Sequence, residues 1–314
     1  MNKADITPDF VARLIAEQFP EWADLPVTPV AVDGHDNTTL RLGDEMSVRL
    51  PSADGYMAQV EKEQRWLPAL ASELPLPIPQ PLAKGEPTPA FRRPWSVYRW
   101  LEGETASHRR VSDLERFAID LAGFLAALYR IDPTGGPRPG MHNFFRGGDL
   151  ATYDGETRDA IDALGDEVDG PAATATWETA RAARWDGAPV WIHGDVFASN
   201  LLVDEEGRLA AVIDFGCTGI GDPACDLTIA WTFLEGESRE AFRTGLALDE
   251  ATWARARGWA LWKALIMLER FSLGSPREQA HHRQVITNVL AEHARMPASR
   301  NAGIRRRDRS TLKS

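Results

Sequence analysis

Three oxygen-bearing side chains surround a single expected hairpin near the middle of the chain. Residues 190–216 read VWIHGDVFASNLLVDEEGRLAAVIDFG, with Asp195, Asn200 five residues later, and Asp214. Two short strands are expected on either side of the turn DEEGR, because apolar runs flank a polar, glycine-bearing segment. Since a hairpin returns the chain to its start, Asp214 is expected to face the loop that carries Asp195 and Asn200.

This arrangement favours phosphoryl transfer, a reaction that depends on positioning and on cations that neutralise phosphate oxygens. Mg²⁺ prefers oxygen ligands and takes one or two protein carboxylates together with phosphates and water. Asp195 is therefore predicted to orient an attacking hydroxyl and accept its proton, and Asn200 and Asp214 to hold the metal. The spacing matches the protein-kinase pattern H-R-D-x-x-x-x-N followed by D-F-G, with Gly194 in place of the arginine. His-Gly-Asp or Asp-Phe-Gly alone is typical of a turn, but the ordered combination indicates a site.

The chain divides into a sheet-rich part and a helix-rich part. In the first part, a helix is expected over 9–19 with Thr7 or Asp9 as its cap, strands over 27–32, 38–43 and 46–51, a helix over 58–74, and a strand from Trp95. A helix over 111–131, capped by Ser112, and the 201–203 and 209–213 strands open the second part, which then continues as helices. We predict an N-lobe over 1–100, a hinge over 101–104, a helical C-lobe over 105–296 and a disordered basic tail over 297–314.

Composition and charge narrow the class of protein. The 314 residues are 43% hydrophobic and 26% charged, which is typical of a soluble globular chain. No apolar run is long enough to span a bilayer, and the first residues lack the apolar core of a secretory signal. Cys217 and Cys225 lack the spacing of a disulfide framework or a zinc site, so a cytoplasmic location is expected.

The net charge of −11 is unevenly spread, because the last residues are basic and the body is correspondingly more acidic. An acidic body disfavours nucleic acid and anionic membranes as partners and would favour a cationic small molecule. A solvated acidic surface that only aids solubility explains the charge equally well. The sequence leaves both a monomer and a homodimer open.

The segment WIHGDVFASNLLVDEEGRLAAVIDFGCTGIGDPACDL resembles the aminoglycoside phosphotransferase family, small-molecule kinases with a protein-kinase-like fold. The likeness extends to GHDNTTLRLGDEMSVRLP, VEKEQRWLPALASELPLPIPQPL and YRWLEG, and so covers most of the chain up to about residue 270. It implies an α+β, two-lobed fold with a small antiparallel-sheet N-lobe and a larger, mainly helical C-lobe. It also implies ATP and Mg²⁺ as cofactors, Asp195 as the catalytic residue, and Asn200 and Asp214 as the metal ligands.

The resemblance implies further residues around the nucleotide. Arg49 stands where the family often has a lysine that binds the phosphates, and Glu63 would be its ion-pair partner. An exposed arginine and glutamate without that role remain the alternative. The loop DGHDNTT would cover the phosphates, with Asn37 and Thr38 as candidate contacts. The remaining implied positions are the adenine-binding backbone of Arg99, Trp100 and Leu101, and His193 and Asp226 as structural support for the catalytic loop.

The acceptor is expected to be a hydroxylated small molecule, either an antibiotic such as an aminoglycoside or macrolide, or a metabolite. The candidate acceptor-binding residues are acidic or aromatic: Asp222, Trp231, Glu235, Trp262 and Glu269. The tryptophans are equally explained as core residues of a helix. Phe197 is expected to shape the acceptor pocket. A catalytically inert nucleotide-binding module of the same fold is the alternative function. A protein Ser/Thr kinase is disfavoured by Gly194 and by the short segment 216–226.

Overall fold

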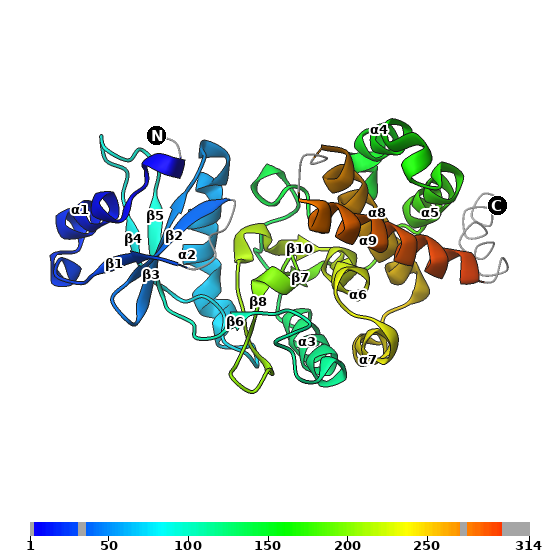
Figure 1. Cartoon of the computed structure of the whole chain (residues 1–314). Helices are drawn as coiled ribbons and strands as arrows, with labels where there is room; N and C mark the ends of the chain where they lie inside the picture. The colour runs from blue at the N-terminus through cyan, green and yellow to red at the C-terminus, as the bar shows by residue number, and fades with distance from the viewer. Residues whose placement is uncertain (1–2, 31–35, 271–274, 297–314) are drawn as a thin grey trace, which may run out of the picture.

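The computed structural model describes residues 3–30, 36–270 and 275–296, which form two lobes (Figure 1). The predicted disordered tail over 297–314 lies outside the described residues. The smaller lobe holds an antiparallel sheet in the order β1-β2-β3-β5-β4. Its strands are β1 (Val27–Pro29), β2 (Asn37–Leu42), β3 (Met46–Pro51), β4 (Pro81–Gly85) and β5 (Trp95–Arg99). Helix α1 (Pro8–Gln18) lies at the outer end of this lobe and α2 (Met57–Ala71) lies beside the larger lobe.

The sheet forms its own apolar core with α1. Leu40 and Leu42 of β2 are buried and alternate with half-buried residues, as expected of a strand with one inward face. They pack in one cluster with Phe10 and Val11 of α1. The helix is capped as expected, because Thr7 Oγ1 accepts a hydrogen bond of 3.2 Å from the backbone N–H of Phe10.

Helix α2 packs against β4 and β5 of its own lobe and also against the larger lobe. Its Leu67 and Leu70 belong to the larger apolar core, together with Val212 and Phe117. The proline-rich segment after α2 follows the same surface, since the backbone N–H of Val212 donates to Pro77 O at 3.1 Å. By its position in the sequence α2 belongs to the smaller lobe, but its apolar side chains Leu67 and Leu70 belong to the core of the larger lobe.

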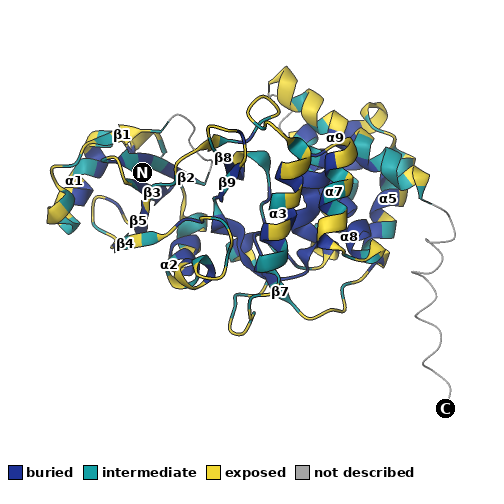
Figure 2. Ribbon diagram, turned by 90° about the horizontal axis from the view of Figure 1, so that it is seen from below, coloured by how far each residue is buried: buried dark blue, intermediate teal, exposed yellow. Residues whose placement is uncertain are grey.

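The larger lobe is mainly helical. Its helices are α3 (Leu114–Leu128), α4 (Asp154–Leu164), α5 (Gly170–Ala182), α6 (Ile229–Thr232), α7 (Gly236–Leu246), α8 (Glu250–Arg270) and α9 (Pro276–Arg295). Helix α8 is mostly buried and packs against α4, α5 and α9, while α3 packs against α7 (Figure 2). Within the described ranges, no helix combines the length and apolarity that a membrane crossing needs.

The start of α3 differs from the sequence expectation. Asp113, not Ser112, caps the helix, and its carboxylate accepts the backbone N–H of Arg116 at 2.9 Å. Ser112 instead uses its backbone N–H to bind the carbonyl of Gly207 in a hairpin turn. This tertiary contact holds Ser112 outside the helix.

Two small sheets lie at the junction of the lobes. One has the order β6-β8-β9, with β6 (Glu104–Thr105), β8 (Leu201–Val203) and β9 (Leu209–Val212). The other pairs β7 (Val190–Ile192) with β10 (Gly219–Gly221). The β8–β9 hairpin confirms the expected strand–turn–strand, and short 3-10 helices at Ala198–Asn200 and Phe215–Cys217 precede and follow it.

Candidate active site

Asp195 and Asn200 lie on one tight loop between β7 and β8. The Asn200 amide Nδ2 donates both to the Asp195 carboxylate Oδ2 at 3.1 Å and to the Asp195 carbonyl at 2.9 Å. The Asn200 carbonyl in turn accepts the backbone N–H of Ile213 at 2.9 Å, so the end of the hairpin is held against this loop. Asp214 follows at once, in the left-handed backbone region at φ 64°. The hairpin thus brings the three predicted side chains into one region, as their spacing indicates.

Burial is the main influence on the Asp195 carboxyl. It raises the pKa of Asp195, the positive charge of Arg146 lowers it, and the negative charge of Asp214 raises it. A carboxylate with a raised pKa is a stronger base once ionised, which suits acceptance of a hydroxyl proton.

Gly194 holds a conformation that other residues do not adopt without strain. Its φ is 84°, and a Cβ at this position would lie 2.4 Å from the carbonyl oxygen of Cys217. The glycine that replaces the kinase arginine is therefore required by backbone geometry.

Asp226 binds the backbone of the catalytic loop from below. Its carboxylate is fully buried and accepts the N–H of His193 at 3.0 Å and that of Gly194 at 2.6 Å. Burial raises its pKa to about 6, against the lowering effect of these two hydrogen bonds. This placement matches the expectation that Asp226 supports the loop.

His193 is buried and both ring nitrogens are engaged. Nε2 lies 3.0 Å from the carbonyl of Ile213, and Nδ1 accepts the backbone N–H of Asp195 at 3.2 Å. These contacts fit one neutral tautomer with the proton on Nε2, and burial lowers the pKa of the ring. The imidazole therefore joins the two ends of the catalytic segment.

Arg49 of β3 links the two lobes at the site. Its guanidinium lies 3.7 Å from the Glu63 carboxylate of α2 and 3.1 Å from the Asp214 carboxylate. Tyr98 donates its hydroxyl to the second Glu63 oxygen, so the glutamate is held from two sides. Burial opposes the charge on Arg49, but the two carboxylates raise its pKa. The expected Arg49–Glu63 pair is present, with Glu63 buried and Arg49 half-buried, and the contact to Asp214 extends it.

Two buried cations near the site were not anticipated from the sequence. Lys62 Nζ donates to the Gly216 carbonyl at 2.7 Å, and burial lowers its pKa to about 8. Arg146 Nε donates to the Gly194 carbonyl at 3.1 Å, and its guanidinium lies 4.8 Å from the Trp262 ring centroid. In the sequence, Lys62 resembles an ordinary surface residue of an amphipathic helix, and Arg146 belongs to no recognisable motif. The sequence around them therefore does not indicate a place in the site.

The nucleotide-contact candidates Asn37 and Thr38 lie at the start of β2. Asn37 and Thr38 are buried on β2, and the Thr38 hydroxyl has no hydrogen-bond partner among the described residues. Residues 33–35 of the expected phosphate loop lie outside the described residues.

The hinge candidates are partly committed to the protein. The backbone N–H of Arg99 donates to Gln80 O at 2.9 Å and that of Trp100 to Glu45 O at 2.7 Å. Leu101 is thus the hinge candidate whose N–H makes no hydrogen bond within the part of the chain that the structure describes.

The donor set of Asn200 and Asp214 fits a hard divalent cation. Asn200 commits its Nδ2 to Asp195, which leaves Oδ1 with one weak contact of 3.5 Å to the Ser199 hydroxyl. Asp214 supplies a partly exposed carboxylate. One amide oxygen and one carboxylate agree with the few protein ligands that Mg²⁺ takes beside phosphates.

A cavity of about 220 Å³ opens beside Asp195. It is lined by the catalytic loop at Asp195 and Phe197, by Thr228 and Thr232 near α6, by Ala260, Lys263, Ala264 and Met267 of α8, and by His281, His282 and Val285 of α9. Phe197, which the sequence suggests as a residue that shapes the acceptor pocket, is among the residues that line this cavity.

The five acceptor-binding candidates are not among the residues that line this cavity. Asp222 is buried in an ion pair with Arg255 at 2.6 Å. Trp231 and Trp262 are core residues whose indole N–H groups bind Glu292 and Glu156. Glu235 is the N-cap residue of α7, and Glu269 pairs with Arg270 at the end of α8. Side-chain partners outside the cavity are thus present for Asp222, Trp231, Trp262 and Glu269.

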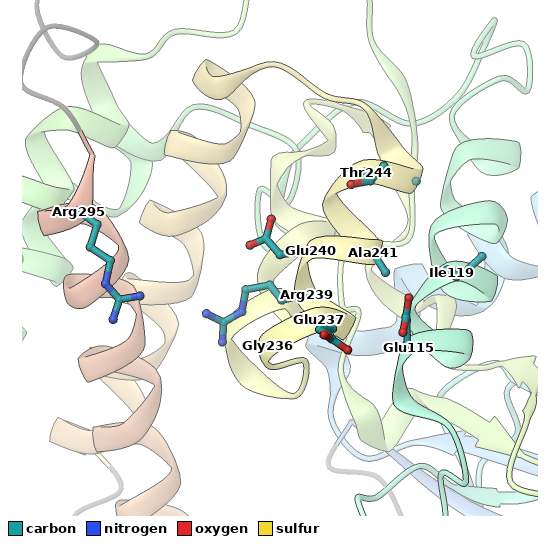
Figure 3. Close-up of a pocket in the computed structure, with 10 residues that line it drawn as sticks. Glu115, Ile119, Gly236, Glu237, Arg239, Glu240, Ala241, Thr244 and Arg295 are labelled. Carbon is teal, nitrogen blue, oxygen red and sulfur yellow. The ribbon is translucent and has the colours of Figure 1, made fainter.

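A larger hollow lies elsewhere in the helical lobe. It has a volume of about 980 Å³ and is lined by residues of α3, α7 and the end of α9, including Glu115, Glu237 and Arg295 (Figure 3). Asp195, Asn200 and Asp214 are not among its lining residues, so chemistry at the hairpin has no access to it.

Comparisons with known proteins agree with this geometry. The model of the phosphotransferase enzyme family matches residues 27–259. The uncharacterized protein YcbJ of Bacillus subtilis (strain 168) is 27% identical over 189 residues, a match that spans 58% of this chain and 56% of that relative.

Solved structures share the fold. The GDP and kanamycin complex of APH(2'')-IIIa has a TM-score of 0.72 at 19% identity, with 90% of this chain and 98% of that chain covered. Macrolide 2'-phosphotransferase MphH from Brachybacterium faecium has a TM-score of 0.57 at 21% identity, with 88% and 98% covered. The fold is thus α+β and two-lobed, as the sequence predicts. Because the family model matches more than half of the sequence, this chain belongs to the phosphotransferase enzyme family.

Proposed function

We propose that this protein is an ATP- and Mg²⁺-dependent phosphotransferase that acts on a hydroxyl group of a small molecule. The observation that carries the proposal is the position of Asp195, which lines a cavity while Asn200 holds its carboxylate at 3.1 Å. A base for a hydroxyl thus lies where an acceptor can enter and beside the residues suited to a metal. Family membership and the nucleotide complexes of structurally similar proteins support the same reaction class.

Each residue then has a separate task. Asp195 accepts the proton of the attacking hydroxyl, and the Asn200 amide keeps its carboxylate oriented toward the cavity. Arg49 binds phosphate oxygens with its guanidinium. Glu63 holds the Arg49 side chain in place, and the Tyr98 hydroxyl holds Glu63. Asn200 Oδ1 and Asp214 would hold Mg²⁺, which when bound neutralises the phosphate oxygens.

The donor is proposed to be ATP, bound between the sheet and the catalytic loop. Leu101 offers the backbone N–H of the hinge that remains available to a base. The solved relatives include both GDP and ADP complexes, so a comparison of ATP with GTP belongs in the first assay.

Replacement of the base tests the mechanism. In Asp195→Asn, hydrolysis of Mg–ATP and transfer to any acceptor should fall about 10²–10⁴-fold, because the proton acceptor is lost. The affinity for Mg–ATP, measured by calorimetry, should change little, since Asp195 is not assigned to the nucleotide. Removal of the metal by a chelator should abolish transfer.

The matched control is Asp159→Asn, which makes the same chemical change on the exposed face of α4. It should behave as the wild type in both measurements. Full transfer by Asp195→Asn would overturn the assigned mechanism. Tight Mg–ATP binding by a wild type without any turnover would favour an inert nucleotide-binding module instead.

A further inference from the structure

The cavity beside Asp195 has an unusual charge for a site that takes an antibiotic cation. Among the described residues that line it, Asp195 is the sole carboxylate, and Lys263, His281 and His282 are the basic groups. Of the acidic candidates from the sequence, Asp222 and Glu269 form ion pairs elsewhere, and Glu235 does not line this cavity. The walls around the catalytic base therefore carry positive or neutral groups.

Lys263 is half-buried and has no partner of its own. No carboxylate lies within ion-pair distance of its Nζ in the described ranges, and its nearest aromatic contact is the Trp262 ring at 6.0 Å. An ammonium removed from water without a partner is costly, and an anionic ligand relieves that cost. Burial lowers the pKa of Lys263, which is the expected consequence of this arrangement.

Lys263 is not simply a counter-charge for the catalytic base. Arg146 stabilises the charged form of Asp195 more strongly than Lys263 does, and Arg146 is fixed by its hydrogen bond to Gly194. The positive charge of Lys263 is thus available to a molecule in the cavity.

Two threonine hydroxyls on the same wall also lack partners. Thr228 Oγ1 and Thr232 Oγ1 are buried and make no hydrogen bond among the described residues. Thr228 is only 5% exposed. Thr228 and Thr232 therefore contribute to the wall of the cavity, while their hydroxyl oxygens are covered by the surrounding protein.

The two histidines add neutral hydrogen-bonding groups. Burial lowers the pKa of both rings, and nearby positive charge lowers it further: His108 acts on His281, while His281 and Lys263 act on His282. Glu278 opposes the shift at His282. At neutral pH these rings are polar rather than charged, which leaves Lys263 as the fixed charge of the wall.

We infer that the acceptor is a small hydroxylated anion, whose carboxylate or phosphate group binds Lys263 while its hydroxyl meets Asp195. This inference rests on the proposed phosphotransferase function and names its substrate class. The volume agrees, because about 220 Å³ lies below the roughly 300–1,000 Å³ of sites for drug-sized ligands. A polycationic aminoglycoside does not match the charge of this cavity, since Asp195 is the sole carboxylate among the described residues that line it.

The experiment compares acceptors that differ in charge. The full chain with Mg–ATP is offered hydroxy acids (gluconate and glycerate), phosphate esters (glycerol 3-phosphate and glucose 6-phosphate), their uncharged counterparts (glucose and glycerol), and kanamycin. Transfer is followed by mass spectrometry, and binding by the shift in thermal unfolding temperature. The two anionic groups separate a carboxylate from a phosphate as the bound charge.

Three variants assign the effect to the lysine. Lys263→Met should weaken binding of the anionic molecules, or raise their KM, about ten- to a hundredfold, since a charge-assisted hydrogen bond is lost. Lys263→Arg should retain most of the binding because it keeps the charge. Lys84→Met is the matched control, because Lys84 lies on β4 of the smaller lobe and does not line the cavity. Its binding of the anionic molecules should equal that of the wild type. Unchanged circular dichroism and Mg–ATP affinity exclude a folding defect.

The outcomes separate cleanly. Lys263-dependent binding or phosphorylation of an anionic molecule supports the inference. It is overturned if no anionic molecule stabilises the wild type, if Lys263→Met binds them equally well, or if glucose, glycerol or kanamycin is the better acceptor. Anion binding that requires Lys263, without Mg–ATP binding or any Asp195-dependent turnover, would overturn the proposed function and leave only an anion-binding pocket.

Discussion

Gly194 and Asp195 depend on each other at the scale of single residues. The positive φ of Gly194 turns the chain so that its N–H points to Asp226 while the next carboxylate faces the cavity. A side chain at position 194 would meet the backbone of Cys217, which belongs to the segment after Asp214. A change at this glycine is therefore transmitted directly to the base.

Gly194→Ala should reduce both stability and turnover. The left-handed conformation and the 2.4 Å approach to Cys217 O together should cost about 1–3 kcal/mol of unfolding free energy. Displacement of Asp195 should lower kcat more than the affinity for Mg–ATP. Urea unfolding and steady-state kinetics measure the two effects.

Gly155→Ala is the control for that substitution. Gly155 lies in α4, and nothing lies within 4 Å of a Cβ added there. The alanine should be neutral or stabilising by up to about 1 kcal/mol, because alanine favours a helix. Equal effects of the two substitutions would show that the backbone at Gly194 is not strained by a side chain.

At the scale of elements, one 3-10 helix supports the catalytic loop. The segment Pro223–Thr228 carries Asp226, whose buried carboxylate binds two successive N–H groups at the end of β7. Tyr129, the C-cap residue of α3, lies 3.5 Å from the same carboxylate. The loop is therefore positioned by elements that are far apart in the sequence.

The raised pKa of Asp226 predicts a specific pH dependence. Folding raises this pKa from 3.8 to about 6, so the native state binds the proton more tightly than the unfolded chain does. The stability that Asp226 contributes is full below about pH 3.8 and is lost as the pH rises through 6, a change of up to about 3 kcal/mol. Asp226→Asn lacks this titration.

The difference in unfolding free energy between wild type and Asp226→Asn isolates the effect. When it is measured by urea titration, the unfolding free energy of the wild type minus that of the variant should decrease from pH 4 to pH 7. A difference that stays constant over this range would contradict the shifted pKa. Comparison of the two proteins cancels the other titrating groups, which both of them share.

At the scale of the whole molecule, the two lobes are joined through α2. Its residues belong to the core of the helical lobe, and Trp66 packs edge-on against Trp191 with ring centroids 5.0 Å apart. Lys62 adds a buried hydrogen bond from the same helix to Gly216. The nucleotide side and the catalytic side of the site are thus fixed to each other by one helix.

Leu67→Ala tests this shared core. Leu67 is fully buried, so the truncation should lower the unfolding free energy by about 2–5 kcal/mol. Because α2 is part of the larger core, the chain should still unfold in one transition, at lower urea. Leu82→Ala, at a position 43% exposed, should change stability by no more than about 0.5 kcal/mol. A separate early transition of the smaller lobe in Leu67→Ala would argue against the shared core.

Much of the fold and the centre of the site could be predicted from the sequence because they depend on local patterns. The strands β2 and β3, helix α1 with its Thr7 cap, and the β8–β9 hairpin follow from alternation, capping and turn chemistry. The hairpin in turn accounts for the meeting of Asp195, Asn200 and Asp214, since short strands leave little freedom in where the chain returns.

The cavity beside Asp195 could not be predicted in this way. Its wall combines Asp195 with Thr228, Lys263 and His281, which come from separate elements. They become neighbours only when α8 packs against α9 and against the segment Pro223–Thr228. Tertiary packing also places Asp222 in a buried ion pair with Arg255. It likewise brings Lys62 of α2 into a hydrogen bond with Gly216 of the other lobe. Spacing along the chain determines which side chains share a turn or a strand face. Helix packing determines which distant side chains share a cavity, and therefore the charge that an acceptor meets there.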